Sequence, residues 1–207
     1  VGDIFEVKYN GEIRRVRVLG FKHDNLVNQN IYGGNHKKAG ISFEFYDFML
    51  GKETRQMNSS ATTLGGWGKT QLRKELNGYN DTNDIQNVSI GGLGLNLSNN
   101  QYIKQVEKQY IKIWNDENSN NNYSYDYLWL LASSEIYSSG EGYGYAITTE
   151  GNQYQFYKER NPIHTHPSEC VQRRNSSNGS MWWLRSPLTP KGVVTYGNDF
   201  CTTSRLW

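Results

Sequence analysis

Alternating apolar and polar positions predict β-strands in the first part of the chain. Residues 4–18 alternate in this way, which is typical of strands with one buried face. Asn10-Gly11 interrupts the pattern, and this dipeptide favours the two-residue turn of a β-hairpin. A second alternating stretch groups three apolar side chains on one side of another strand: Ile41, Phe43 and Phe45.

Helical spacing is confined to short stretches. Thr70 is a favourable N-cap and Asn77-Gly78 a favourable end, so we expect one short helix between them. The apolar residues of 103–113 fit both a helix and a strand, and both interpretations stay open. The continuous apolar run of 127–132 predicts a buried central strand, followed by a short helix that Ser133 caps.

The last part of the chain predicts further strands separated by long polar loops. Residues 180–186 form a strand that Pro187 closes, and 192–207 form a strand pair with a turn at 197–199. A strand or a helical turn is expected within 142–161. These patterns predict an α+β fold of antiparallel strands, one or two short helices and long loops. Since neither a repeat nor a linker is visible, residues 1–207 are expected to form a single domain.

Composition narrows the kind of core and the kind of partner. Hydrophobic residues make up 36% of the chain and aromatic residues 14%, so the core is expected to be rich in aromatic side chains. The net charge is +2 and no long run of Lys and Arg occurs, which argues against a nucleic-acid partner. No apolar run approaches the ~18 residues needed to cross a bilayer, so we expect no membrane insertion.

The sequence Trp182-Trp183-Leu184-Arg185-Ser186-Pro187 predicts a strand with both faces covered. Alternation places Trp183 and Arg185 on one face, and Trp182 and Leu184 on the other. An arginine on a covered face needs carboxylate or carbonyl partners for its guanidinium group. We therefore expect Trp182, Trp183 and Arg185 to belong to the structural core. An exposed Trp–Arg platform that stacks on a sugar is the alternative.

Candidate catalytic and metal-binding residues are few and scattered. His23-Asp24 forms a His–carboxylate pair, but no nucleophile motif accompanies it. A loop near position 165 offers three metal-ligand types without the fourth ligand that a structural zinc site needs: His164, His166 and Cys170. Three carboxylates compatible with glycoside hydrolysis, if they meet, lie far apart in sequence: Glu135, Glu141 and Glu150. We expect no metal, no cofactor and no enzymatic activity.

The two cysteines allow two interpretations, a disulfide between Cys170 and Cys201 or two free thiols, and both stay open.

Several segments, taken in order, resemble an uncharacterised bacterial and bacteriophage domain family whose hallmark is the sequence WWLRSP. The segments are Asn10-Gly11 with the following strand, MNSSATTLGGWGKTQLRKELN at 57–77, YLWLLASSEIY at 127–137, EGNQYQFYK at 150–158 and WWLRSP at 182–187. The resemblance spans nearly the whole chain. It implies a C-type-lectin-like fold, similar in architecture to formylglycine-generating enzymes and to the variable proteins of diversity-generating retroelements.

The resemblance implies a ligand-recognition module of a phage tail or a bacterial surface or secreted protein. Its expected partner is a protein or glycan on a cell surface, and a homo-oligomer is compatible with it. The segment 195–205 falls where variable proteins carry their binding surface. Seven residues there are expected to bind the ligand, and several are of the types that antibodies use for recognition: Tyr196, Asn198, Asp199, Phe200, Thr202, Ser204 and Arg205.

The chain departs from this family pattern in ways that weaken other interpretations. The family continues with a closing strand of the type G-V-x-P-A-F, whereas this sequence stops at Trp207, so we expect that strand to be missing or supplied from elsewhere. Gly197-Asn198-Asp199 matches only part of a calcium-dependent sugar-binding signature. Cys170 and Cys201 match no active-site pair of the oxidase-type relatives. A hydrolase or oxidase on the same scaffold, or an assembly domain, remains the alternative function.

Overall fold

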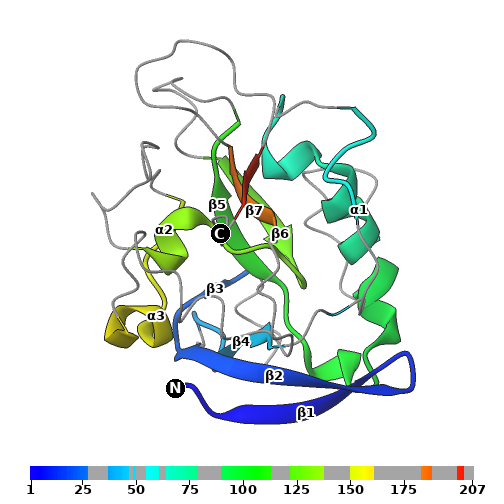
Figure 1. Ribbon diagram of the computed structural model, residues 1–207, viewed down its shortest axis with the longest axis vertical. Helices are drawn as coiled ribbons and strands as arrows, with labels where there is room; N and C mark the ends of the chain where they lie inside the picture. The colour runs from blue at the N-terminus through cyan, green and yellow to red at the C-terminus, as the bar shows by residue number, and fades with distance from the viewer. Residues whose placement is uncertain are drawn as a thin grey trace, which may run out of the picture.

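The computed structural model confirms the predicted α+β class, with short antiparallel strands and few helices (Figure 1). It describes residues 1–27, 37–46, 49, 55–60, 64–78, 90–112, 122–137, 150–160, 183–187 and 200–202. The strands are β1 (Ile4–Tyr9), β2 (Glu12–Phe21), β3 (Asn25–Leu26), β4 (Ile41–Phe45), β5 (Val106–Tyr110), β6 (Asn122–Asp126), β7 (Trp183–Pro187) and β8 (Phe200–Thr202). The α-helices are α1 (Gln71–Asn77), α2 (Ser133–Ile136) and α3 (Gln155–Arg160), and the 3-10 turns are η1 (Trp67–Lys69), η2 (Gly92–Asn96) and η3 (Asn100–Tyr102).

The described strands form three separate sheets. Their orders are β1-β2-β4, β3-β5-β6 and β7-β8, and every pairing is antiparallel. In Figure 1 the first sheet lies along the bottom, while β5, β6 and β7 lie at the centre between α1 on one side and α2 on the other. The segment around β7 is thus surrounded by elements from distant parts of the sequence.

The N-terminal hairpin forms as predicted, with β1 paired to β2. Asn10 has φ 50° and Gly11 has φ 81°. Positive φ at both central positions is the requirement of a type I′ turn, and Asn and Gly tolerate it best. The turn sets the register in which Tyr9 lies opposite Glu12.

A register shift in β2 and the alternation of β4 decide which side chains enter the interior. The shift between Val18 and Gly20 leaves Leu19 fully buried. On β4, Ser42 and Glu44 are buried, whereas Ile41 and Phe43 are exposed. The predicted alternation of Ile41, Phe43 and Phe45 is therefore present. However, Ile41 and Phe43 face solvent, and the polar residues between them face the interior.

The polar face of β4 is buried because Asp24 supplies a partner for Ser42, while Arg17 and α3 supply partners for Glu44. The Arg17 guanidinium bonds the Glu44 carboxylate and lies 3.9 Å from the centre of the Phe156 ring. The Tyr157 hydroxyl donates to Glu44 at 2.8 Å. A buried ion pair with these extra contacts satisfies groups that burial would otherwise destabilise.

The predicted helix after Thr70 is present as α1. The Thr70 hydroxyl accepts a hydrogen bond from the Arg73 backbone N–H at 3.2 Å, and Gly78 closes the helix in the left-handed conformation with φ 75°. Both features are the expected caps. The apolar face packs into an aromatic-rich cluster made of Met57, Trp67, Leu72, Leu76 and Tyr110.

Two expectations about the middle of the chain change. Residues 127–132 are buried or half-buried but do not form the predicted central strand; the strand is β6, which lies just before them in an Asn-rich stretch. The ambiguity over 103–113 is resolved as strand β5, because β6 pairs along its whole length. The short helix α2 follows as expected, but Ser133 is its first residue and Ala132, not Ser133, occupies the N-cap position. The stretch 142–161 contributes helix α3.

Aromatic side chains make up half of a second buried cluster, which includes Leu184 of β7. Its buried members are Leu19, Leu131, Ile136, Tyr137, Tyr154, Phe156, Tyr157 and Leu184. The expectation of an aromatic-rich core is confirmed for the described residues. Among those residues, no helix has the length and apolarity to cross a bilayer.

Candidate functional site

Strand β7 lies in the interior of the described structure. Leu184, Arg185 and Ser186 are all buried, and the Arg185 backbone N–H donates to the Leu131 carbonyl at 3.0 Å. Strand β8 pairs with β7 in antiparallel register, with Thr202 opposite Trp183 and Phe200 opposite Pro187. The strand thus has backbone neighbours on two sides, β8 and the distant segment around Leu131.

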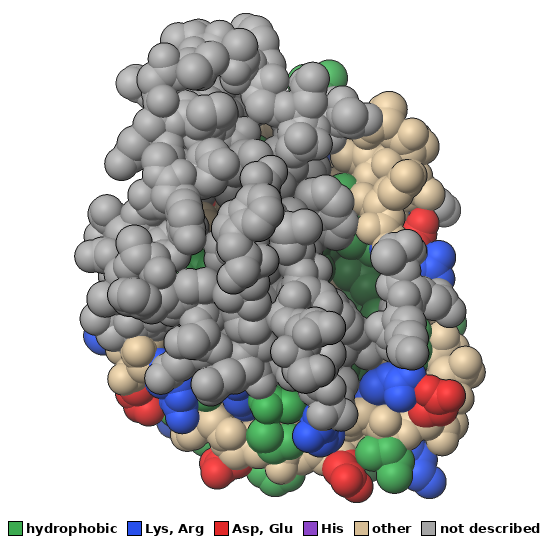
Figure 2. All heavy atoms as spheres, in the orientation of Figure 1, with side chains coloured by type: hydrophobic (Ala, Val, Ile, Leu, Met, Phe, Trp, Pro, Cys, Tyr) green, Lys and Arg blue, Asp and Glu red, His purple; other side chains and the backbone are tan. Residues whose placement is uncertain are grey.

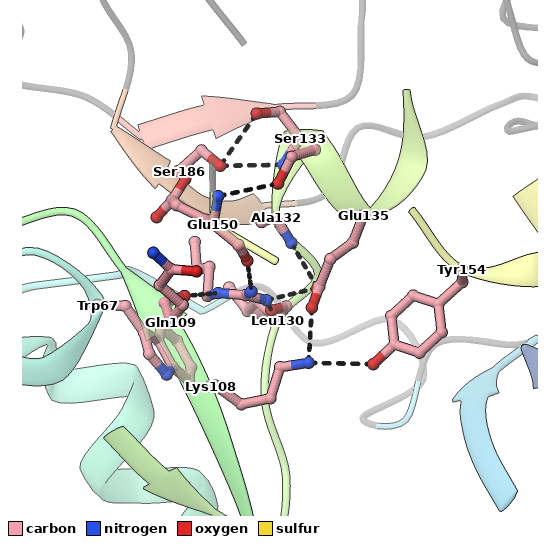
Figure 3. Close-up of polar contacts among 12 residues, drawn as sticks. Trp67, Lys108, Gln109, Leu130, Ala132, Ser133, Glu135, Glu150, Tyr154 and Ser186 are labelled. Atoms are coloured by element: carbon pink, nitrogen blue, oxygen red, sulfur yellow. Dashed lines mark hydrogen bonds and ion pairs between the residues drawn. The ribbon is translucent and has the colours of Figure 1, made fainter. Parts of the chain in front are cut away.

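The Arg185 side chain is fully buried and bonds to several elements at once. Its Nε donates to the Gln109 carbonyl at 3.0 Å, and its Nη1 donates to the Leu130 carbonyl at 2.8 Å. Nη1 also bonds the Glu135 carboxylate at 2.6 Å, and Nη2 donates to the Glu150 carbonyl (Figure 3). The planar guanidinium offers five donors in fixed directions, and this site uses them on four segments of chain.

Glu135 links Arg185 to a second buried cation. Its Oε2 accepts from Arg185 and from the Ala132 backbone N–H at 3.0 Å, while its Oε1 accepts from Lys108 Nζ at 2.6 Å. Burial acts to raise the pKa of Glu135, but the Arg185 and Lys108 charges outweigh it and hold the pKa below its usual value. Glu135 therefore stays ionised in the interior.

Lys108 lies at an inward position of β5, and its ammonium group donates to three partners. Nζ bonds Asp24 Oδ1 at 2.7 Å. It also bonds Glu135 Oε1 at 2.6 Å and contacts the Tyr154 hydroxyl at 3.1 Å (Figure 3). It also lies 4.8 Å from the centre of the Trp129 ring. A buried ammonium with carboxylates on two sides is compensated rather than isolated.

Asp24 and Tyr154 complete this buried polar network. Asp24 bonds the Ser42 hydroxyl and accepts from the Tyr154 hydroxyl at 2.9 Å. Burial acts to raise the pKa of Asp24, but Lys108 and the Ser42 hydrogen bond lower it to below its usual value. Burial, and then the negative charges of Glu135 and Asp24, hold the pKa of the Tyr154 hydroxyl well above its usual value. We call the set Asp24, Lys108, Glu135, Tyr154 and Arg185 the core network.

His23 lies at the half-buried margin of the core network. Its ring stacks on Tyr154 with 4.0 Å between the ring centres. Burial lowers the pKa of His23 below its ordinary value, and this effect exceeds the opposing influence of Asp24. The predicted His23-Asp24 pair is thus part of a larger arrangement, in which Lys108 and Tyr154 contact the same carboxylate.

His23, Asp24 and Glu135 bring ligand atoms of three metal-binding side chains within 4.8 Å of one another. In this arrangement the Lys108 ammonium already bonds both carboxylates. A divalent cation would have to displace that charge, so the chemistry of the donors favours an internal ion network. His164, His166 and Cys170 lie outside the described residues.

The carboxylates singled out for glycoside hydrolysis do not act as a pair. Glu135 bonds Arg185 and Lys108, whereas the Glu150 carboxylate accepts from the Ile111 backbone N–H at 3.1 Å. Both residues are buried. Glu141 lies outside the described residues.

The expected ligand-binding residues are described only in part. Phe200 and Thr202 lie on β8, which pairs with β7. Tyr196, Asn198, Asp199, Ser204 and Arg205 lie outside the described residues, as does Trp182. For Trp183, Phe200 and Thr202 the structure describes the backbone. It places Arg185 in the interior.

Sequence reasoning missed Lys108 and Tyr154 as members of the network. A signal for Lys108 exists: it alternates with Val106 and Tyr110, which places a cation on the apolar side of a strand. Nothing in the sequence near Tyr154 distinguishes it from the other tyrosines.

The lowered pKa of His23 predicts a stability change near neutral pH. The unfolded chain takes up a proton at its ordinary pKa of 6.5, before the folded chain does, so stability is expected to fall as the pH drops below that value. Urea unfolding at pH 7.5 and 5.5 should show this fall in the wild type. His23→Phe keeps a ring beside Tyr154 without titrating and should show a smaller fall. Equal falls in both proteins would contradict the assignment.

Comparison with family models, curated proteins and solved structures finds no match.

Proposed function

We propose that the chain is a ligand-recognition module with a C-type-lectin-like architecture, carried by a phage tail or by a bacterial surface or secreted protein. Its ligand is a protein or glycan on a cell surface. The proposal is supported by the α+β arrangement of antiparallel strands and by the family resemblance carried by the WWLRSP segment. The segment 195–205 is proposed to make the contacts.

The main support for the proposal is that the hydrogen bonds of Arg185 hold β7 in place. Arg185 bonds the carbonyls of Gln109, Leu130 and Glu150 as well as the Glu135 carboxylate, so a rigid strand runs through the interior. β8 pairs with this strand, so Phe200 and Thr202 are anchored to a preorganised framework. Sites supported in this way lose less conformational entropy on binding.

The residue types of the segment suit a recognition surface. Tyr196 and Phe200 supply rigid aromatic area, while Asn198 and Ser204 supply adaptable hydrogen-bonding groups. In a diversified variable protein, closely related chromosomal copies would differ mainly between 195 and 207, at codons that contain adenine. Copies that differ evenly along the chain would argue against diversification.

Alanine substitutions in this segment test the proposal. Tyr196→Ala and Phe200→Ala are each expected to weaken binding to bacterial cells or to an arrayed glycan at least tenfold, as anchor residues do, with an unchanged melting temperature. Tyr102→Ala is the matched control, because Tyr102 is 74% exposed on another part of the chain and should keep full binding. If Tyr196→Ala and Phe200→Ala lose stability and binding together, those side chains belong to the core and the proposal is wrong.

The enzymatic alternative rests on the convergence of His23, Asp24 and Glu135. We favour a structural role for these carboxylates, because each bonds the buried Lys108 ammonium and neither is exposed. A hydrolase would need at least one of them to reach its substrate.

A further inference from the structure

The outer face of the β1-β2-β4 sheet carries a strip of exposed apolar side chains. Phe5, Phe21, Ile41 and Phe43 are 52%, 51%, 45% and 44% exposed. Phe21 lies opposite Ile41 in the ladder, and the Phe5 and Phe43 rings pack edge to face with centres 6.4 Å apart. We call these residues the apolar strip. Figure 2 shows apolar side chains at the surface along the lower edge of the molecule, where Figure 1 places β1 and β2.

The local structure of the sheet brings these side chains together. Val18 lies opposite Phe43, and without the register shift in β2 the side chain of Phe21 would point to the other face. Instead the shift buries Leu19 and aligns Phe21 with the apolar strip. A regular strand would turn Phe21 to the inner face, so the shift adds one exposed phenylalanine to the outer face.

The size of the apolar strip favours a small partner. Side chains of this size present about 150–250 Å² each, and about half of each is exposed, so the strip offers about 400 Å². A stable complex between two folded proteins buries about 800 Å² on each partner. The strip therefore suits a short segment of chain better than a second globular surface.

Positive charge near one end of the apolar strip indicates which residues the bound peptide segment carries. Lys22 follows Phe21 directly, and Lys37 and Lys38 precede β4, with Lys38 in a bridge to Asn25. All three lysines are exposed, and within the described part of the chain none has a carboxylate at ion-pair distance. Exposed cations beside an apolar surface complement a ligand with an apolar body and an acidic end.

We propose that the apolar strip is a second binding surface, which takes a short apolar peptide segment whose end carries acidic residues. The apolar side chains of the segment cover Phe5, Phe43 and Ile41. Its carboxylates meet Lys22, Lys37 and Lys38, which lie beyond the end of the ladder at Phe21 and Ile41. This surface shares no residue with the segment 195–205, so each proposal can fail without the other.

A fluorescent probe of the same chemistry provides the first test. The dye 8-anilinonaphthalene-1-sulfonate combines an apolar aromatic body with an anionic group, and the intact chain is expected to bind it. Phe43→Ser and Ile41→Ser should each weaken dye binding at least fivefold, and replacing Lys22, Lys37 and Lys38 together by Gln should weaken it to a similar extent. Leu64→Ser removes an apolar side chain elsewhere that is even more exposed, at 73%, and should leave dye binding unchanged. Melting temperatures identify any variant that fails to fold.

Selection of peptides from a random displayed library on the intact chain provides the second test. The selected peptides should combine apolar and acidic residues, displace the dye and lose binding to Phe43→Ser and to the triple Gln variant. An empty selection, or peptides that bind Phe43→Ser equally well, would overturn the proposal. Phe43-dependent dimerisation in sedimentation would assign the face to a second copy, and Phe43-dependent binding to anionic vesicles would assign it to a membrane. Either result would also overturn it.

Discussion

Replacing Arg185 by methionine is expected to lower the free energy of unfolding by about 3–5 kcal/mol. The variant keeps an apolar stem of similar length but leaves Glu135 without one of its buried cations. It also removes the hydrogen bonds to the carbonyls of Gln109, Leu130 and Glu150. Buried acceptors without donors are destabilising, so the loss should exceed that of an ordinary surface substitution. Urea unfolding of the intact chain measures it.

Arg160→Met is the matched control for this prediction. Arg160 is exposed on α3, and its guanidinium lies 4.0 Å from the centre of the Phe156 ring, so the same chemical change should alter the free energy of unfolding by only about 1 kcal/mol or less. Arg185→Lys keeps the charge but not the planar fork, and it should recover only part of the lost stability. If Arg185→Met behaves like Arg160→Met, Arg185 does not hold β7 in place.

Lys108→Met is expected to produce a loss of similar size, about 3–5 kcal/mol at pH 7.5. Lys108 is the cation that Asp24 and Glu135 share, and its removal leaves two buried carboxylates close together. Their mutual repulsion and burial would raise the pKa of both groups in the variant. The difference in stability between wild type and variant should therefore shrink as the pH falls towards 5, because protonation removes the repulsion.

The pH dependence separates this mechanism from simple loss of packing. Lys74→Met, on the exposed side of α1, controls for the change in net charge and should have little effect at either pH. A deficit of Lys108→Met that stays constant between pH 7.5 and 5 would show that the ammonium contributes by packing. That result would contradict the ion network described above.

Elements with strong local signals could be predicted from the sequence. The hairpin at Asn10-Gly11, the caps of α1 at Thr70 and Gly78, and the strand that ends at Pro187 all follow from backbone preferences of a few residues. Helix α2 also forms where it was expected, although Ala132 rather than Ser133 is its N-cap. The nearest neighbours in the chain decide the turn and the caps, whereas β7 also depends on its pairing with β8 and on the partners of Arg185.

Elements that depend on tertiary pairing could not be predicted in the same way. The run 127–132 has the composition of a buried strand, but β5 pairs with β6 instead. Strand β6 has the mainly polar sequence Asn-Tyr-Ser-Tyr-Asp. Pairing with β5 and the burial of Ser124 and Asp126 override the low strand preference of Asn122 and Asp126. Residues 127–132 are still largely withdrawn from solvent, so their apolar character predicted burial but not conformation.

The core network depends on contacts across large sequence separations. Asp24 bonds Lys108, and Tyr154 bonds Asp24 across 130 residues of sequence. No periodicity connects such positions, and only the need for a partner of Arg185 could be inferred. Likewise, alternation in β4 predicted two faces but not that Ser42 and Glu44 would lie on the inner one. The partners on α3 that make this arrangement favourable are more than a hundred residues away.

Hydrogen exchange at the backbone amide of Arg185 tests most directly whether β7 is an interior strand held by the core network. This amide donates to the Leu131 carbonyl at 3.0 Å and belongs to a fully buried residue. We predict that it exchanges only through global unfolding, with an opening free energy equal to that from urea unfolding. Exchange at a rate typical of exposed loops would contradict the account, because β7 would then be a mobile surface strand.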